Sequence, residues 1–161
     1  MRRIIFMGIT ACIITTIALV SSFGDEAKKT VEKAKGHYAV HGGCLNALGT
    51  CEIGHVEVKL SGATMKLWFV GGVNDTRNAV RVPDKEIVLS VTLDGQNEAK
   101  TIILKAKPIE DNGEKEGDCS CFKGSASWLK GVSKLTAKGT VQFKGKTQSI
   151  VIEWPNGYEP D

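Results

Sequence analysis

From His55 to the C-terminus, apolar and polar residues alternate in short runs that are separated by glycine, asparagine and aspartate. A period of two places every second side chain on the same face of a β-strand, whereas an amphipathic helix needs a period near 3.6. Three pairs of such runs flank turn sequences and predict β-hairpins: 56–60 with 65–69, 87–93 with 102–106, and 141–143 with 150–154. With further strands expected around 38–40 and 79–82, the pattern predicts an all-β fold: a single immunoglobulin-like antiparallel β-sandwich of about seven or eight strands over residues 37–161.

Two segments interrupt this pattern. The run EDNGEKEGD at 110–118 is too polar to bury itself and predicts a surface loop that leads into Cys119. The segment SASWLKG around Trp128 predicts a helical turn over one end of the sandwich.

The N-terminal segment has the order of an export signal over residues 1–24. Two arginines precede a long apolar run, and small residues precede the charged sequence DEAKK. An uncleaved membrane anchor is the alternative, because the apolar run is close to the roughly 17 residues that can span a bilayer. A lipid-modified Cys12 fits less well, since the apolar run continues beyond it. Residues 25–36 are highly charged and predict a tether or a short helix.

The net charge of the chain limits the kinds of partner that it can attract. Removing Arg2 and Arg3 with the signal leaves 19 of the 21 basic residues against 18 acidic ones. Such a nearly neutral chain gives no electrostatic support to a nucleic-acid partner. We expect a periplasmic or secreted single domain that meets a membrane only through an uncleaved N-terminal segment.

The chemistry of the chain is concentrated between His37 and Glu57, which contains all three histidines and two of the five cysteines. If Val56 and Val58 point into the core, His55 and Glu57 share the opposite face of one strand. Upstream, a Gly42-Gly43 bend lets the neighbouring side chains converge. Imidazole and thiolate suit copper and zinc, so the sequence predicts a transition-metal site with these ligands: His41, Cys44, Cys51, His55 and Glu57.

The cysteines also have other interpretations. A Cys44/Cys51 disulfide would close a short loop and contribute on the order of 2.5 kcal/mol. Cys119 and Cys121 are separated by one residue, and a bond between them would be strained. They could pair with Cys44 and Cys51, add ligands to a metal site, or act as a redox pair. A disulfide-stapled interaction or envelope module, and a thiol redox protein, therefore remain alternatives to metal binding.

Several short motifs resemble a group of small exported bacterial domains. The similarity rests on His41-Gly42-Gly43, on His55-Val56-Glu57 with the apolar strand after it, and on Cys121-Phe122-Lys123-Gly124 before Leu129-Lys130-Gly131. Such domains are often found beside heavy-metal efflux components, and the resemblance implies metal handling without assigning catalytic residues. This chain differs from that pattern by its four additional cysteines.

Together these features predict an exported copper- or zinc-binding protein without catalytic activity. Its role would be that of a carrier, a sensor or an accessory to efflux components.

Overall fold

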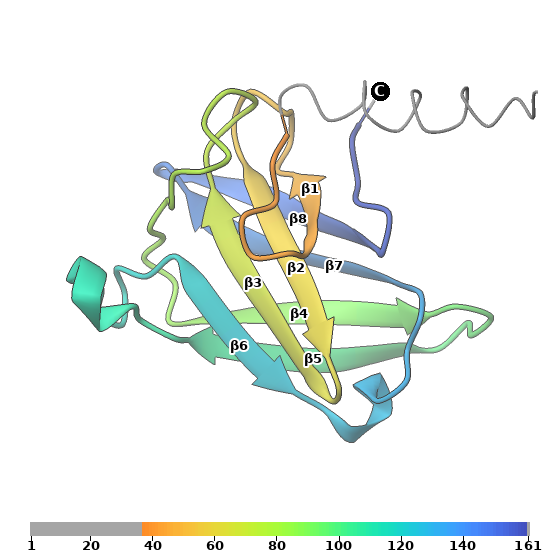
Figure 1. Ribbon diagram of the computed structural model, residues 1–161. Helices are drawn as coiled ribbons and strands as arrows, with labels where there is room; N and C mark the ends of the chain where they lie inside the picture. Colours follow the sequence, from red (N-terminus) through yellow and green to blue (C-terminus); the bar gives the residue numbers. More distant parts are fainter. Residues whose placement is uncertain (1–36, 161) are drawn as a thin grey trace, which may run out of the picture. The chain divides into compact units, whose positions relative to one another are not determined.

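The computed structural model describes residues 37–160, which form eight antiparallel strands in one hydrogen-bonded sheet (Figure 1). The strands lie in the order β1-β2-β3-β6-β5-β4-β7-β8 across the sheet. Their bounds are β1 Cys44–Ala47, β2 His55–Ser61, β3 Thr64–Val70, β4 Glu86–Leu93, β5 Ala99–Ala106, β6 Cys121–Ser125, β7 Leu135–Phe143 and β8 Lys146–Trp154. The prediction of an all-β antiparallel fold with seven or eight strands is confirmed.

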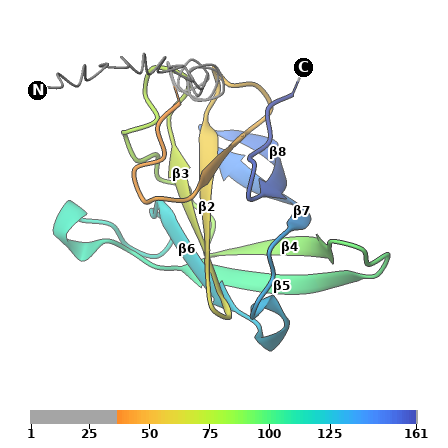
Figure 2. The ribbon, with the colours of Figure 1, turned by 45° about the vertical axis from the view of Figure 1, so that its right-hand side comes forward.

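The sheet folds over itself, so that its two halves face each other like the layers of a sandwich. In both ribbon views the β4/β5 hairpin lies across the direction of β2, β3 and β6 (Figures 1 and 2). The two edge strands, β1 and β8, contact each other. There the buried Asn46 side chain accepts a hydrogen bond of 2.8 Å from the Glu153 amide. This bond links the two edge strands, which do not pair through a regular ladder of backbone hydrogen bonds.

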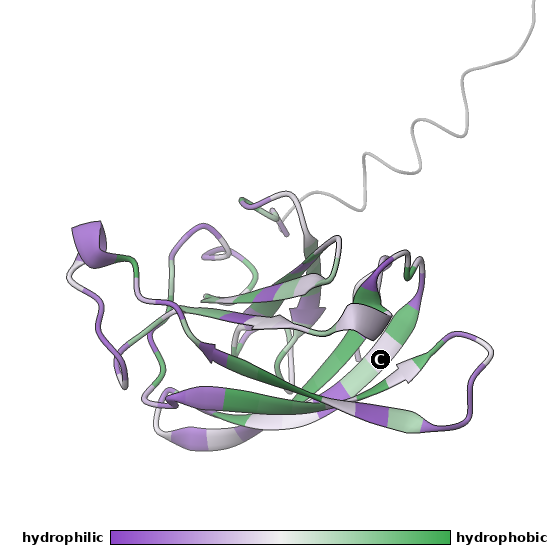
Figure 3. Cartoon of the chain, turned by 90° about the horizontal axis from the view of Figure 1, so that it is seen from below, coloured by the Kyte–Doolittle hydropathy of each residue, from purple (hydrophilic) through white to green (hydrophobic). Residues whose placement is uncertain are grey.

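The period-two pattern of the sequence builds the core. Polar and apolar residues alternate along the strands in the hydropathy view (Figure 3), and buried and exposed positions alternate along most of β4 and β7. Burial of each large apolar side chain stabilises the fold by about 1.5–3 kcal/mol. The largest fully buried side chains include Phe69, Phe122, Phe143, Leu48, Met65 and Leu67.

All three predicted hairpins are present as β2/β3, β4/β5 and β7/β8. The predicted helical turn is also confirmed, as a short 3-10 helix over Ser127–Leu129. In the described part of the chain, no helix has the length and apolar character needed to cross a membrane. The predictions for residues 1–24 and 25–36 lie outside the described residues.

Two of the predicted strands are absent. Residues 38–40 form no strand, because the chain turns just beyond them and the His41 and Gly43 amides bind the Glu57 carboxylate instead of a neighbouring strand. Residues 79–82 make only isolated bridges at Ala79 and Val82. Pro83 follows directly and has no backbone N–H to extend a ladder.

The 110–118 segment is mostly an exposed loop, as predicted, with a short 3-10 helix over Glu110–Asn112. Glu114 is the exception, since it is only 6% exposed. Its carboxylate accepts hydrogen bonds from the Ser120 hydroxyl at 2.5 Å and from the Ile109 amide at 3.0 Å. These bonds satisfy the buried carboxylate. The polarity of the segment had predicted that Glu114 would be exposed to solvent.

Candidate metal centre

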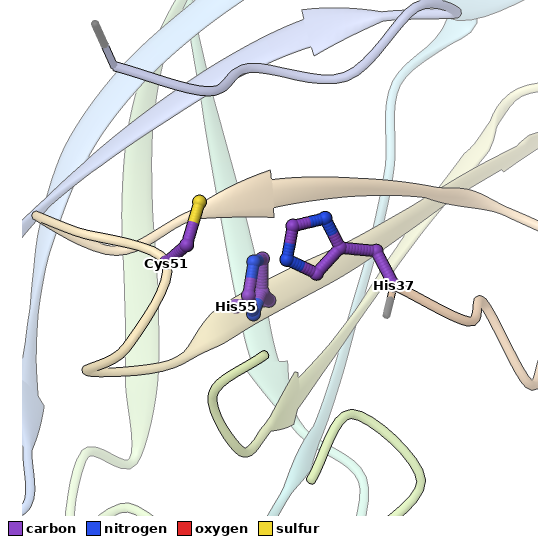
Figure 4. Close-up of side chains that lie close together, drawn as sticks. All are labelled: His37, Cys51 and His55. Atoms are coloured by element: carbon purple, nitrogen blue, oxygen red, sulfur yellow. The ribbon is translucent and has the colours of Figure 1, made fainter. Parts of the chain in front are cut away.

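One group of three potential metal ligands lies within residues 37–160, and it consists of His37, Cys51 and His55. Each residue offers one ligand atom, and these atoms all lie within 4.8 Å of one another. Figure 4 shows the two imidazoles side by side, with the Cys51 sulfur on the far side of His55 from the His37 backbone. His37 precedes β1, Cys51 lies in the turn between β1 and β2, and His55 begins β2. Three separate segments therefore supply the group.

His55 is held in one orientation by the backbone. The residue is 1% exposed, and its Nδ1 lies 3.1 Å from the Gly71 carbonyl oxygen. A carbonyl oxygen can only accept a hydrogen bond, so Nδ1 carries the proton and Nε2 carries a lone pair. This is the arrangement of a metal-binding histidine whose second nitrogen is fixed by an outer partner.

His37 shows the same arrangement with a carboxylate in place of a carbonyl. Its Nδ1 lies 3.0 Å from Oε1 of Glu159, a residue 122 positions away in sequence. Since the ionised carboxylate also only accepts, His37 donates from Nδ1 and leaves the Nε2 lone pair free. The N-terminal and C-terminal ends of the described chain thus meet at this histidine.

Both free nitrogens lack a partner. Within residues 37–160, two buried side-chain nitrogen or oxygen atoms have no hydrogen bond, and they are Nε2 of His37 and Nε2 of His55. Buried polar atoms in native proteins are almost always satisfied by protein, water or a bound ion. Two such atoms beside a thiol in one cluster match the donor set of a soft or borderline metal ion.

The local environment favours the neutral forms of His55 and Cys51. Burial lowers the pKa of His55, which favours the uncharged imidazole that binds metal. Partial burial, with Glu159 and Glu52 nearby, raises the pKa of the Cys51 thiol. A metal ion would therefore have to displace the Cys51 proton, so its affinity is expected to fall with falling pH.

The structure separates His41 and Glu57 from this group. Glu57 is fully buried, and its carboxylate accepts hydrogen bonds from the His41 amide at 2.8 Å, the Gly43 amide at 2.8 Å and the His41 Nδ1 at 2.9 Å. The His41 ring stacks on Trp68, with centroids 4.3 Å apart. The outward face of β2 is therefore covered by the 37–43 segment, and Glu57 orients that segment.

Gly43 is required for this close approach. A Cβ atom at this position would collide with the Val58 carbonyl oxygen. The Gly42-Gly43 bend that sequence analysis placed beside a metal site thus brings His41 onto Glu57 and Trp68, away from His55 and Cys51.

The remaining predicted ligands lie elsewhere. All four cysteines of the described chain are free thiols, so neither the Cys44/Cys51 disulfide nor any pairing of Cys119 and Cys121 is formed. The Cys44 sulfur lies 3.9 Å from the Glu153 carbonyl oxygen. Burial raises the pKa of Cys119 and raises that of Cys121 to about 11. Such thiols are poor nucleophiles and poor redox groups.

Sequence reasoning missed His37 as a ligand and Glu159 as its partner. His37 belongs to the histidine-rich run, but it lies 14 residues before Cys51 and outside any predicted strand. The sequence holds no local signal for Glu159, because its contact with His37 joins two segments that are 122 residues apart and meet only in the folded protein.

Comparison with known proteins adds nothing to this site, since no family model, curated protein or solved structure matches the chain.

Proposed function

We propose that this chain is an exported protein that binds one copper or zinc ion through His37, Cys51 and His55. The observation that carries the proposal is the pair of buried, unpartnered Nε2 atoms next to the Cys51 thiol. Each imidazole has its Nδ1 proton committed to an oxygen acceptor, so both lone pairs are available to one ion.

The donor set narrows the choice of ion. Two imidazole nitrogens and one thiolate are soft or borderline ligands, which favour copper and zinc over calcium or magnesium. Three protein ligands complete a trigonal site for Cu(I), whereas Zn(II) would take water or another group in a fourth position. An incomplete shell suits a protein that passes its ion on.

The place of the site supports a carrier or sensor role. His37 and Cys51 are only partly buried, whereas His55 is buried. An ion bound here would be reachable from one side. The resemblance of the HGG and HVE motifs to domains found beside heavy-metal efflux components favours such components as partners.

Titration of the reduced protein with Cu(I) and with Zn(II) tests the proposal. We expect one ion per chain, and His37→Ala, Cys51→Ser and His55→Ala should each weaken binding by at least about tenfold. His41→Ala is the matched control, because His41 lies in the same run but points to Glu57 and Trp68. Equal losses with His41→Ala, or no loss with the three ligand variants, would remove the proposal.

A further inference from the structure

Four lysines stand in one row across the outer face of four adjacent strands. In the strand register, Lys59 of β2 faces Lys66 of β3, Lys66 faces Lys123 of β6, and Lys123 faces Lys105 of β5. Neighbouring strands lie about 4.7–4.9 Å apart, so the row sets positive charges at nearly equal intervals. A strand neighbour of each lysine is fully buried on the other face: Val58, Leu67, Phe122 and Leu104.

No carboxylate of the described chain forms an ion pair with this row. The ion pairs found among residues 37–160 include none of the four lysines. Glu86 faces Lys105 from β4 and ends the row, but it makes no ion pair. Lys59 donates one hydrogen bond of 2.8 Å to the His41 carbonyl oxygen. Like charges placed directly opposite each other in a sheet are destabilising, so this arrangement opposes the stability of the isolated protein.

A second row beside the lysines also offers hydrogen-bond donors. Ser61 faces Thr64, and Thr64 faces Ser125, each two residues along its strand from a lysine of the first row. A pocket of about 400 Å³ joins the two rows at one end, between the hydroxyls, the first two lysines and the His41–Trp68 stack. Ammonium and hydroxyl groups together bind oxyanions.

We propose that this face binds an anionic polysaccharide that lies along the lysine row. An anionic polysaccharide carries carboxylate or sulfate groups at intervals along one chain, so several of them can meet the lysines at once. The hydroxyl row is placed to bond sugar hydroxyls, and the pocket beside Trp68 receives one further substituent. Because these charges are exposed, dissolved salt screens their attraction for an anionic ligand, and the affinity should fall as the salt concentration rises.

Two features disfavour other polyanions. Proteins that bind single-stranded nucleic acids stack the bases on exposed aromatic rings. Among the described residues of these four strands, Trp68 is the aromatic side chain on this face, and it is already stacked against His41 at an interplanar angle of 4°. The net charge of the whole chain is only +3, so the row is a local feature and not part of a basic surface that would attract DNA over a distance.

Binding of labelled polygalacturonate and labelled heparin to the purified protein tests the proposal and separates carboxylate from sulfate recognition. We expect saturable binding to at least one of them at low salt, and a loss of at least about tenfold in Lys66→Gln/Lys123→Gln. The matched control is Lys138→Gln/Lys146→Gln, which removes the same charge from exposed positions on β7 and β8 and should change affinity less than about twofold.

A second measurement guards against misfolding of the variant. Without polysaccharide, Lys66→Gln/Lys123→Gln should melt at the same temperature as the native protein or higher at low salt, because the repulsion is relieved. Absence of binding, equal losses in both double variants, or tighter binding to a single-stranded oligonucleotide or to anionic vesicles would overturn the proposal. None of these results depends on metal, so they are independent of the proposed metal site.

Discussion

The imidazole rings of His37 and His55 lie 4.7 Å apart between centroids and are inclined at 56° to each other. Each ring keeps its Nδ1 bonded to an oxygen acceptor and its Nε2 buried without a partner. Since an unsatisfied buried polar atom costs about 1–3 kcal/mol, two of them together need a physical reason. A shared metal ion, completed by the Cys51 sulfur, supplies that reason.

Glu159→Gln should weaken metal binding although Glu159 is not itself a proposed ligand. The carboxylate accepts the Nδ1 proton of His37 and makes the ring a stronger donor, and loss of such outer partners weakens affinity by about 10–100-fold. Competition titration with Cu(I) measures the effect, with the exposed Glu98→Gln as the control. Unchanged affinity in Glu159→Gln would contradict the role of Glu159 as the outer partner of His37.

Gly72→Ala should disturb the site through the backbone. A Cβ atom at Gly72 would collide with the Glu52 carbonyl oxygen, so the turn that carries Cys51 must move. Gly139→Ala introduces a similar collision with the Val88 carbonyl oxygen in a different part of the sheet. Both variants should melt at lower temperature, but only Gly72→Ala should lose metal affinity. Equal metal affinity in the two variants would contradict the placement of Cys51.

Much of the fold could be predicted from the sequence, because hairpins are local. The runs that became β2/β3, β4/β5 and β7/β8 each carry a period-two pattern and a turn sequence between them. The order of the strands in the sheet could not be predicted in this way, because the pairing of β3 with β6 and of β4 with β7 joins residues far apart in the chain. No local pattern encodes those contacts.

The site was harder to predict for the same reason. Alternation correctly placed His55 and Glu57 on one face of one strand, but it implied that this face meets solvent. The structure covers that face with the 37–43 segment, so His55 is 1% exposed and Glu57 is fully buried. Within the covering segment, His37 contacts His55, whereas His41 contacts Glu57.

Glu57→Ala should destabilise the fold without altering metal affinity. The buried carboxylate accepts hydrogen bonds from two backbone amides and one imidazole, and its loss leaves these donors unpaired. We expect the free energy of unfolding to fall by about 1–3 kcal/mol or more, the cost of leaving a buried donor unsatisfied. Chemical denaturation measures this value. A large loss of metal affinity at a temperature where the variant is folded would instead make Glu57 a ligand.

Cys121 should resist alkylation at pH 8. Burial, with Cys119 close by, raises its pKa from 9.0 to about 11, so only about one molecule in a thousand carries the thiolate at that pH. The reaction rate should keep increasing as the pH rises towards 11. Because the unfolded thiol ionises first, the stability that this burial contributes is full below pH 9 and is lost as the pH rises through 11.

Mass spectrometry of iodoacetamide-treated protein resolves the individual cysteines. The partly exposed Cys51 should react before Cys119 and Cys121, and unfolding in guanidinium should remove the difference. Rapid alkylation of Cys119 or Cys121 in the folded protein would favour the thiol redox interpretation.

X-ray absorption spectroscopy of the zinc-loaded protein tests the central claim most directly. The proposed ligands predict two imidazole nitrogens at about 2.0–2.1 Å and one sulfur at about 2.3 Å from the ion, with the sulfur signal lost in Cys51→Ser and retained in Cys44→Ser. A first shell without sulfur, or a sulfur signal that survives Cys51→Ser, would contradict a site built from His37, Cys51 and His55.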